Sequence, residues 1–273
     1  LPYGRKIKTQ KPPPPWSRIE HGAQLKQSLE QAYIESKKRR LAAGIQVHGA
    51  TPGLYIQFES QPNVLLKLES LEARRSGIEL VAVTYHHTDD MEPRTIEQAT
   101  VFVPDGKLKY FFSRFEKYAL QTPKKRREQR HEDLIDRIGK LRLATLRALW
   151  TDASEAYPEE EPMWWEVWLR RHDGNELQRL TEFAGLMNLP ISERRLEFDD
   201  RIVTLLYAAA KQLATSIDVL NDLAEVRKAK ESAAFFADMP ADEQAEWAKD
   251  LRGRIKGPEE NAPAVCVLDT GIN

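Results

Sequence analysis

One order of strand-like and helix-like segments occurs twice in this chain, and it limits the folds that the chain can adopt. In the first occurrence, four short segments with strand-like patterns are predicted strands: 54–58, 78–85, 99–103 and 139–143. Two segments with apolar residues at helical spacing separate them, one from Asn63 to Gly77 and one over 108–120. The resulting order, β-α-β-β-α-β, is typical of the ferredoxin-like fold.

The second occurrence follows an acidic run, Glu159 to Glu161, which we interpret as a solvated linker. Asp199-Asp200 is a hairpin signal between its second and third strands, and helices are predicted over 176–189 and 211–223. The predicted strands are 164–169, 193–198, 202–207 and 224–228. We therefore expect an α+β fold with two ferredoxin-like units in tandem, although the two units share little sequence identity.

A basic, proline-rich arm opens the chain. Its cations are Arg5, Lys6, Lys8 and Lys11. They lead into Pro12 to Pro15 and Trp16, and four consecutive prolines favour polyproline II and exclude a helix. Such a run either docks on a groove with aromatic walls or packs along the protein's own surface. We prefer the second interpretation because the run lacks a repeated ligand motif.

A long helix is predicted after the arm. Ser17 is a plausible N-cap with Glu20 as its capping-box partner, and the helix should cover about 18–43. Its apolar stripe consists of Leu25, Leu29, Ala32 and Tyr33. The basic run 37–40 lies in the last turns, where cations favour the helix dipole, and no aromatic residue interleaves it. The pattern therefore favours a helix end over a nucleic-acid site.

Three tryptophans fall in one predicted strand of the second unit. Because side chains alternate along a strand, Trp164 and Trp168 should share one face and Trp165 the other. Core packing is the preferred interpretation, since aromatic side chains dominate core burial. An aromatic residue left exposed there would instead indicate a partner surface.

The end of the sequence combines a predicted helix with a short apolar strand. Asp238 or Asp242 can cap a helix that contains Trp247 and Leu251. The apolar run 264–268 follows, bounded by proline and glycine, and suits a strand buried on both faces in a parallel sheet. The carboxylate of Asp269 comes where this strand ends, which is where catalytic groups gather in α/β proteins.

Residues Val267 to Ile272, Val-Leu-Asp-Thr-Gly-Ile, resemble the first catalytic motif of the subtilisin-like serine peptidases. In that family a strand of small and branched apolar residues ends in Asp-[Ser/Thr]-Gly-[Ile/Val]. The resemblance implies that Asp269 is the catalytic acid of an Asp-His-Ser triad, where it holds the imidazole in the right tautomer. It also implies that Gly271 permits the tight turn. The other interpretation is a chance apolar strand with an aspartate in its loop.

The remaining subtilase motifs do not occur in this sequence. Neither His-Gly-Thr nor Gly-Thr-Ser-Met-Ala is present, so we expect the triad histidine and serine to lie beyond Asn273. The chain is then a fragment that cannot hydrolyse a peptide bond alone. An aspartic protease is disfavoured, because its Asp-Thr-Gly is usually followed by Ser or Ala and it needs a second aspartate and a flap.

The resemblance also assigns a role to the second unit. Subtilase propeptides fold as small β-α-β-β-α-β domains, pack on the peptidase and direct their last strand toward its active-site cleft. Residues 158–232 stand in the place of such a propeptide. The Asp-Leu-Ala-Glu-Val-Arg segment at 222–227, the doubled unit and the motif at Asp269 resemble large intracellular bacterial subtilases that pair with an ATPase.

Two functions therefore remain open. The first is a regulatory, propeptide-like region of a subtilisin-like endopeptidase, with the rest of the peptidase domain and a peptide or protein substrate as partners. The second is a protein interaction module that recruits or senses a partner such as the ATPase. The expected division is a basic arm and helix, two ferredoxin-like units, a helical linker and a first peptidase strand, over 1–44, 45–152, 158–232, 233–262 and 263–273.

Composition supports a soluble, cytoplasmic protein. The chain has 273 residues, a formal net charge of −1 and one cysteine, Cys266, which we interpret as a buried structural thiol in the strand before Asp269. No apolar run approaches the ~20 residues of a membrane span. We expect no cofactor and no metal. The run 86–90, His-His-Thr-Asp-Asp, has suitable ligand types, but adjacent strand residues point to opposite faces.

Overall fold

The computed structural model describes residues 17–50, 52–88, 94–120, 134–158, 160–230, 239–255 and 257. The chain divides into two compact units, residues 1–229 and residues 230–273, and each is described by itself. The proline-rich arm 1–16 and the predicted peptidase strand 263–273 lie outside the described residues.

Helix α1 covers Arg18–Ala43, as the sequence predicts. Ser17 caps it by accepting the Glu20 N–H at 3.2 Å, and Gly44, with φ of 63°, ends it in the left-handed conformation that glycine adopts without strain. Its stripe is buried at Leu25, Leu29 and Ala32. Leu25 and Leu29 belong to the core of the first sheet, although the sequence groups this helix with the arm.

The first sheet has four antiparallel strands in the order β2-β3-β1-β4. These strands are β1 (Gly53–Ser60), β2 (Glu79–His87), β3 (Thr95–Pro104) and β4 (Ile138–Leu143). Helix α3 (Lys109–Leu120) joins β3 to β4, as predicted. This order is that of the ferredoxin-like fold.

The helix predicted from Asn63 to Gly77 is wrong. Only one turn forms, α2 (Leu68–Leu71), followed by a 3₁₀ turn at Arg74–Ser76. Asn63 does not cap a helix: its φ is 59° and its Oδ1 accepts the Thr95 N–H. The backbone N–H of Leu66, within this segment, donates instead to the carboxylate of Glu97. A helix over these residues would have to give up that bond.

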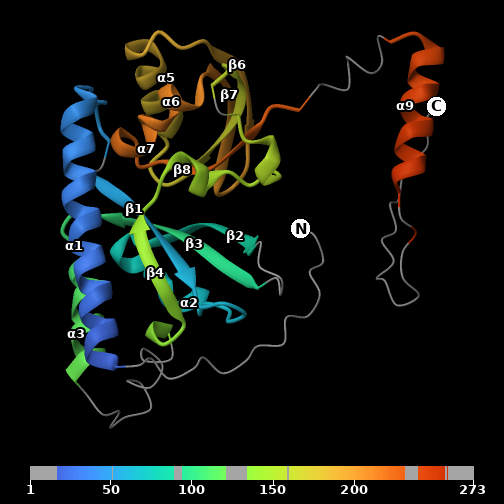
Figure 1. Cartoon of the computed structure of the whole chain (residues 1–273). Helices are drawn as coiled ribbons and strands as arrows, with labels where there is room; N and C mark the ends of the chain where they lie inside the picture. The colour runs from blue at the N-terminus through green and yellow to red at the C-terminus, as the bar shows by residue number, and fades with distance from the viewer. Residues whose placement is uncertain are drawn as a thin grey trace. The chain divides into compact units, whose positions relative to one another are not determined.

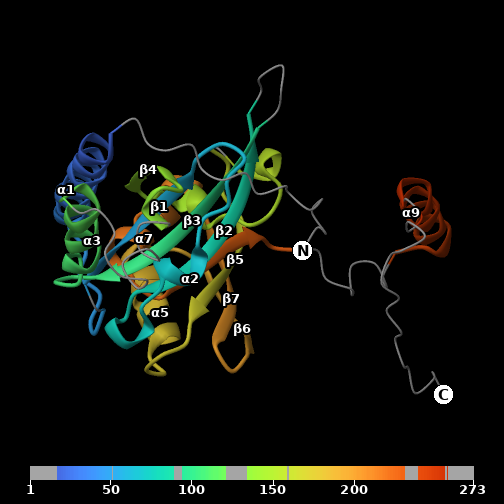
Figure 2. The ribbon, with the colours of Figure 1, turned by 90° about the horizontal axis from the view of Figure 1, so that it is seen from below.

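Helix α1 fills the space that a full crossover helix would have taken. It lies beside α3 and contacts β4, and Figures 1 and 2 show the two helices side by side. A Cβ on Gly22 would meet the Ala119 Cβ at 3.0 Å, so the two helices approach closely there. The core beneath them contains Phe58, Phe111 and Phe115.

The second sheet repeats the same topology, with antiparallel strands in the order β6-β7-β5-β8. These strands are β5 (Met163–Arg170), β6 (Ile191–Glu197), β7 (Arg201–Ala208) and β8 (Leu223–Lys228). Helix α5 (Glu176–Leu186) joins β5 to β6. The α+β fold with tandem ferredoxin-like units is therefore confirmed.

The last predicted helix of this unit, 211–223, is only partly correct. It is broken into α6 (Ala210–Ala214) and α7 (Ser216–Val219), and Leu223 is the first residue of β8. The Ser216 hydroxyl donates to the Leu213 carbonyl at 2.6 Å, a local bond of the kind that competes with a continuous helix.

Besides the core between the first sheet and its helices, a second hydrophobic core is shared by both sheets. Tyr55 on β1 and Phe102 on β3 are buried in the same cluster as Trp165 and Leu206 of the second sheet. The Tyr55 hydroxyl donates to the Leu223 carbonyl at 3.0 Å. The 3₁₀ turns Leu146–Leu149 and Ser154–Ala156 lie on the connection between the units.

Helix α9 (Ala241–Arg254) belongs to the other compact unit. Pro240 occupies its N-cap position and Asp242 lies in the first turn, so the prediction that Asp242 caps the helix is wrong, and Asp238 lies outside the described residues. Trp247, Leu251 and Ile255 recur at four-residue spacing and all are more than half exposed.

Candidate functional site

Asp269, the predicted catalytic acid, lies outside the described residues, together with Cys266 and the rest of the apolar run. Its role therefore stays a prediction. His86 and His87 are consecutive on β2 and pair with Ile96 and Thr95 on β3, while Asp89 and Asp90 lie outside the described residues.

The tryptophans of β5 alternate as predicted. Trp165 is fully buried in the shared core and its indole N–H donates to the Ala208 carbonyl at 2.9 Å. Trp164 is 41% exposed and packs against Tyr207 of β7, with ring centroids 5.4 Å apart. The expectation of core packing is therefore confirmed for Trp165 and wrong for Trp164.

An aromatic cluster covers the face of the second sheet opposite Trp165, and we call it the aromatic face. Its members are Trp164, Trp168, Phe198 and Tyr207. Trp168 and Phe198 stack with centroids 5.9 Å apart and planes 5° from parallel. Leu196 on β6 stands in the row of Trp168 and is 62% exposed.

The two edges of this sheet differ. The outer edge of β8 is covered, because Trp150 forms a bridge to Val226 and the Lys228 N–H donates to Asp152 Oδ2 at 2.9 Å. The opposite edge strand, β6, is exposed over residues 193–197. Pairing with a strand from another polypeptide is therefore open at β6 rather than at β8.

The turn between β5 and α5 holds a buried network of charges. Arg179 donates to Asp222 from Nε at 2.6 Å and from Nη2 at 2.9 Å, and it also bonds both carboxylate oxygens of Asp173. The pKa of Asp173 is lowered, chiefly by its hydrogen bonds with Arg179. Three consecutive backbone N–H groups, of residues 172 to 174, donate to Glu176 Oε1.

His172, Asp173 and Glu176 bring ligand atoms within 4.8 Å of one another, as in metal sites. Their other contacts favour a structural role. The Arg179 guanidinium already supplies the cation, and amide donors surround Glu176 Oε1. The network fixes the turn that leads into α5. Sequence reasoning missed it, although the run His-Asp-Gly-Asn-Glu at 172–176 contains Asp173 and Glu176, two of its acidic members.

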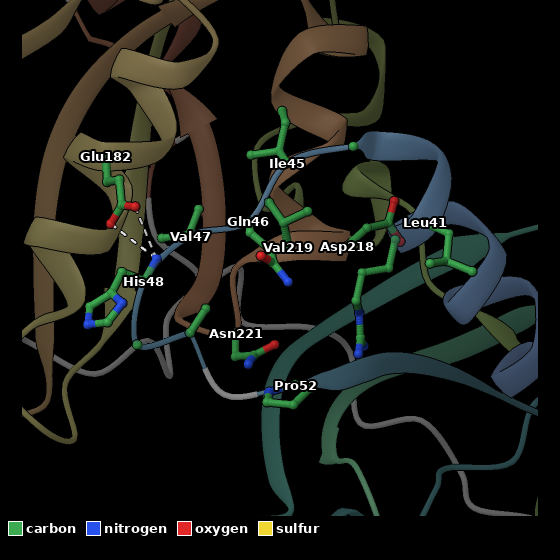
Figure 3. Close-up of a pocket in the computed structure, with 14 residues that line it drawn as sticks. Leu41, Ile45, Gln46, Val47, His48, Pro52, Glu182, Asp218, Val219 and Asn221 are labelled. Carbon is green, nitrogen blue, oxygen red and sulfur yellow. Dashed lines mark hydrogen bonds between the residues drawn. The ribbon is translucent and has the colours of Figure 1, made fainter.

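A cavity of about 790 Å³ opens along the linker between α1 and β1, beside α5 and α7, and we call it the linker cavity. Its lining comes from the end of α1, residues 44–50, Pro52, α5, α7 and Asn221. Figure 3 shows Asp218, Val219 and Asn221 along the chain from α7 to β8, with His48 and Glu182 at the other end. Both carboxylate oxygens of Glu182 accept the backbone N–H of His48, at 3.1 and 3.2 Å.

Two polar side chains of this cavity lack partners. Among the described residues, Asp218 accepts no hydrogen bond and forms no ion pair, and Asn221, 5% exposed, has no acceptor for its amide nitrogen. Burial raises the pKa of Asp218 to about 6, against the partial opposition of the positive charges of Arg39 and Arg40. No sequence motif indicated this cavity, because its residues come from three distant segments.

Residues 19–145 match the family model of the Y4kK N-terminal domain. The matched region begins in α1 and ends just after β4, so it includes the helix that completes the first core as well as the first sheet. No curated protein and no solved structure matches this chain. Among the helices of the described residues, none is long and apolar enough to cross a membrane.

Proposed function

We propose that this chain is the N-terminal, propeptide-like regulatory region of a subtilisin-like serine endopeptidase and that Asp269 supplies the acid of its triad. The observation that carries the proposal is the order of two features. A ferredoxin-like unit, β5 to β8, precedes a strand-like run that ends in Asp-Thr-Gly-Ile. Subtilase propeptides have this topology and stand before this motif.

The aromatic face is the surface with which the second unit would pack on the peptidase. Trp164 and Leu196 are exposed on it, and burial of large apolar side chains drives association. Arg227 lies 4.6 Å from the centroid of Trp168 and adds a cation at the side of β8. Because β8 is covered on its outer edge, the chain after residue 230 or the edge of β6 would approach the active-site cleft.

Asp269 would act through the histidine of the triad. A buried carboxylate that accepts the imidazole N–H fixes its tautomer and stabilises the imidazolium formed when the serine is deprotonated. Replacement by asparagine preserves the shape but removes the charge, and in serine peptidases such a change lowers kcat by about 10⁴. The effect on labelling by an active-site reagent would be similar in direction.

The first experiment tests the peptidase assignment. The complete coding region is expressed and treated with a serine-directed fluorophosphonate, beside an Asp269→Asn variant and an Asp242→Asn control on α9. We expect labelling of the parent and of the control, and strongly reduced labelling of Asp269→Asn. A parent protein that resists labelling under all conditions, including after limited proteolysis, would contradict the peptidase assignment.

A second experiment tests regulation by the aromatic face. Trp164→Ser in the complete protein should raise turnover of a peptide substrate if this face holds the unit on the peptidase. Leu120→Ser is the matched control, since Leu120 is 82% exposed at the end of α3 and outside the aromatic face. Equal turnover of the parent, Trp164→Ser and the control would rule out regulation through Trp164.

The second candidate function is recruitment of a partner protein such as an ATPase. It is favoured by the exposed stripe of α9, formed by Trp247, Leu251 and Ile255, because amphipathic helices bind in apolar grooves through residues at this spacing. A Trp247→Ser, Leu251→Ser double variant should abolish stimulation of turnover by a purified ATPase and leave fluorophosphonate labelling unchanged. Unchanged stimulation would exclude this stripe as the recruiting surface.

A further inference from the structure

The linker cavity combines apolar walls with two carboxylates, of which Glu182 accepts a backbone N–H and Asp218 has no direct partner among the described residues. The walls include Ile45, Val47, Val219 and Pro52, and Val47 and Val219 are themselves buried. A cavity of about 790 Å³ lies within the range of ligand sites, in which apolar walls surround a few polar groups. Among the described residues that line it, the Asp218 carboxylate forms no hydrogen bond or ion pair, and the Asn221 amide nitrogen is buried without an acceptor.

The charged groups around Asp218 are already committed to other partners. On α1, Arg39 pairs with Glu35 at 3.0 Å and Arg40 pairs with Asp105 at 3.1 Å. On the linker and α5, the carboxylate of Glu182 accepts the His48 N–H. Arg40 also donates to the Gly53 carbonyl. The two arginines lower the cost of ionising Asp218, but neither lies within ion-pair distance of it.

We propose that the linker cavity binds an alkyl cation, an ammonium or guanidinium group on an apolar stem, with Asp218 as its counterion. The carboxylate would gain the direct partner that it lacks, and the stem would lie against the valine and isoleucine walls, as lysine side chains do on apolar surfaces. An anion is disfavoured, because Asp218 and Glu182 both line the cavity and Arg40 is held by Asp105.

Asn221 bears on the source of the cation. Its amide nitrogen is buried and has no acceptor among the described residues, so it would have to turn about χ2 toward the cavity to meet an acceptor on a ligand. A lysine or arginine in a polypeptide brings a main-chain carbonyl as well as a cation, whereas a free polyamine brings cations alone. The unpaired amide therefore favours a basic residue of a polypeptide segment. This inference is independent of the proposed peptidase function.

The experiment titrates the complete chain with N-acetyl-lysine methylamide and with cadaverine, and follows the Asp218 carboxyl signal by NMR. Pentan-1-ol and pentanoate have comparable stems without the positive charge and serve as control probes. We expect saturable binding of the cationic probes only. Asp218→Asn should weaken binding at least tenfold, whereas Asp200→Asn, an exposed carboxylate in the β6–β7 turn, should leave it unchanged.

Binding should also depend on pH. With the carboxyl group titrating near pH 6 in the free protein, affinity for the cationic probes should fall about tenfold between pH 7.5 and pH 5. Tighter binding of the lysine derivative than of cadaverine would identify a polypeptide as the source, and the reverse order would identify a polyamine. Thermal unfolding of Asp218→Asn in parallel establishes that the variant is folded.

Two results would overturn the proposal. One is the absence of any saturable shift of the Asp218 signal with either cation up to the solubility of the probe. The other is equal binding of pentan-1-ol and the cations, which would make the cavity a purely apolar site. A third measurement tests whether Arg40 takes part in the site. Arg40→Gln should raise the pKa of Asp218 further and leave binding of the cationic probes intact, whereas loss of binding would contradict a site formed by Asp218 without Arg40.

Discussion

Arg179 and Asp222 form an ion pair in the protein interior, with Nε 2.6 Å from Oδ2 and side chains only 3% and 2% exposed. Arg179→Leu should lower the free energy of unfolding by about 3–5 kcal/mol, because it leaves the Asp222 carboxylate buried without its partner. Urea denaturation measures the change. Gln178→Leu on the exposed side of α5 is the control and should alter stability by less than about 0.5 kcal/mol.

Glu176→Gln should destabilise the protein by about 1.5–3 kcal/mol at pH 7, since the charged acceptor of three backbone N–H groups is lost. Burial works to raise the pKa of Glu176, but these N–H bonds outweigh it and the pKa is lowered from 4.5. Its stabilisation is therefore present above about pH 4.5 and disappears as pH falls through the lowered value. A parent–variant difference that stays constant from pH 7 to pH 3 would contradict this account.

Asp218→Asn should change the free energy of unfolding in the opposite direction and stabilise the protein. In the folded protein the pKa of Asp218 is raised by burial to about 6 from 3.8, so the folded state takes up a proton before the unfolded state does. Ionisation above pH 6 thus destabilises the fold, and the asparagine variant should be more stable than the parent by about 1–2 kcal/mol at pH 7.5. Thermal melts at pH 7.5 and pH 4 should show this advantage only at the higher pH.

Two glycines provide a matched pair of alanine substitutions. A Cβ on Gly53 would lie 2.4 Å from the Phe102 ring and 2.9 Å from the Val103 carbonyl oxygen, so Gly53→Ala should destabilise by about 1–3 kcal/mol. Gly185 in α5 has open space around its Cβ position. Gly185→Ala should therefore stabilise by about 0.5–1 kcal/mol. Equal melting temperatures for the two variants would contradict the packing seen at Gly53.

Much of the fold follows from local signals. Ser17 and Gly44 mark both ends of α1, and Asp199-Asp200 marks the β6–β7 hairpin, because capping and turn chemistry depend on residues close in sequence. The errors arise where distant residues decide. The run after Asn63 has apolar residues at helical spacing. Its Leu66 N–H nevertheless donates to the carboxylate of Glu97, thirty-one residues away.

The candidate site was less accessible to sequence reasoning. Alternation along β5 separates Trp165 from Trp164, but it cannot tell which face a second layer covers. The linker cavity was invisible for a different reason. Asp218 and Arg40 are far apart in sequence, and only the packing of α7 beside α1 brings the charge of one to bear on the other.

The hydroxyl of Tyr55, on the first sheet, donates a hydrogen bond to a carbonyl of β8, the last strand of the second sheet. Because that residue and Phe102 are embedded among the tryptophans and leucines of the neighbouring repeat, we expect the two halves to unfold together. The duplicated architecture should consequently lose its structure in a single step. Cleavage of the junction between the halves should then give two fragments that stay associated through this core and unfold together, not a pair of separable modules.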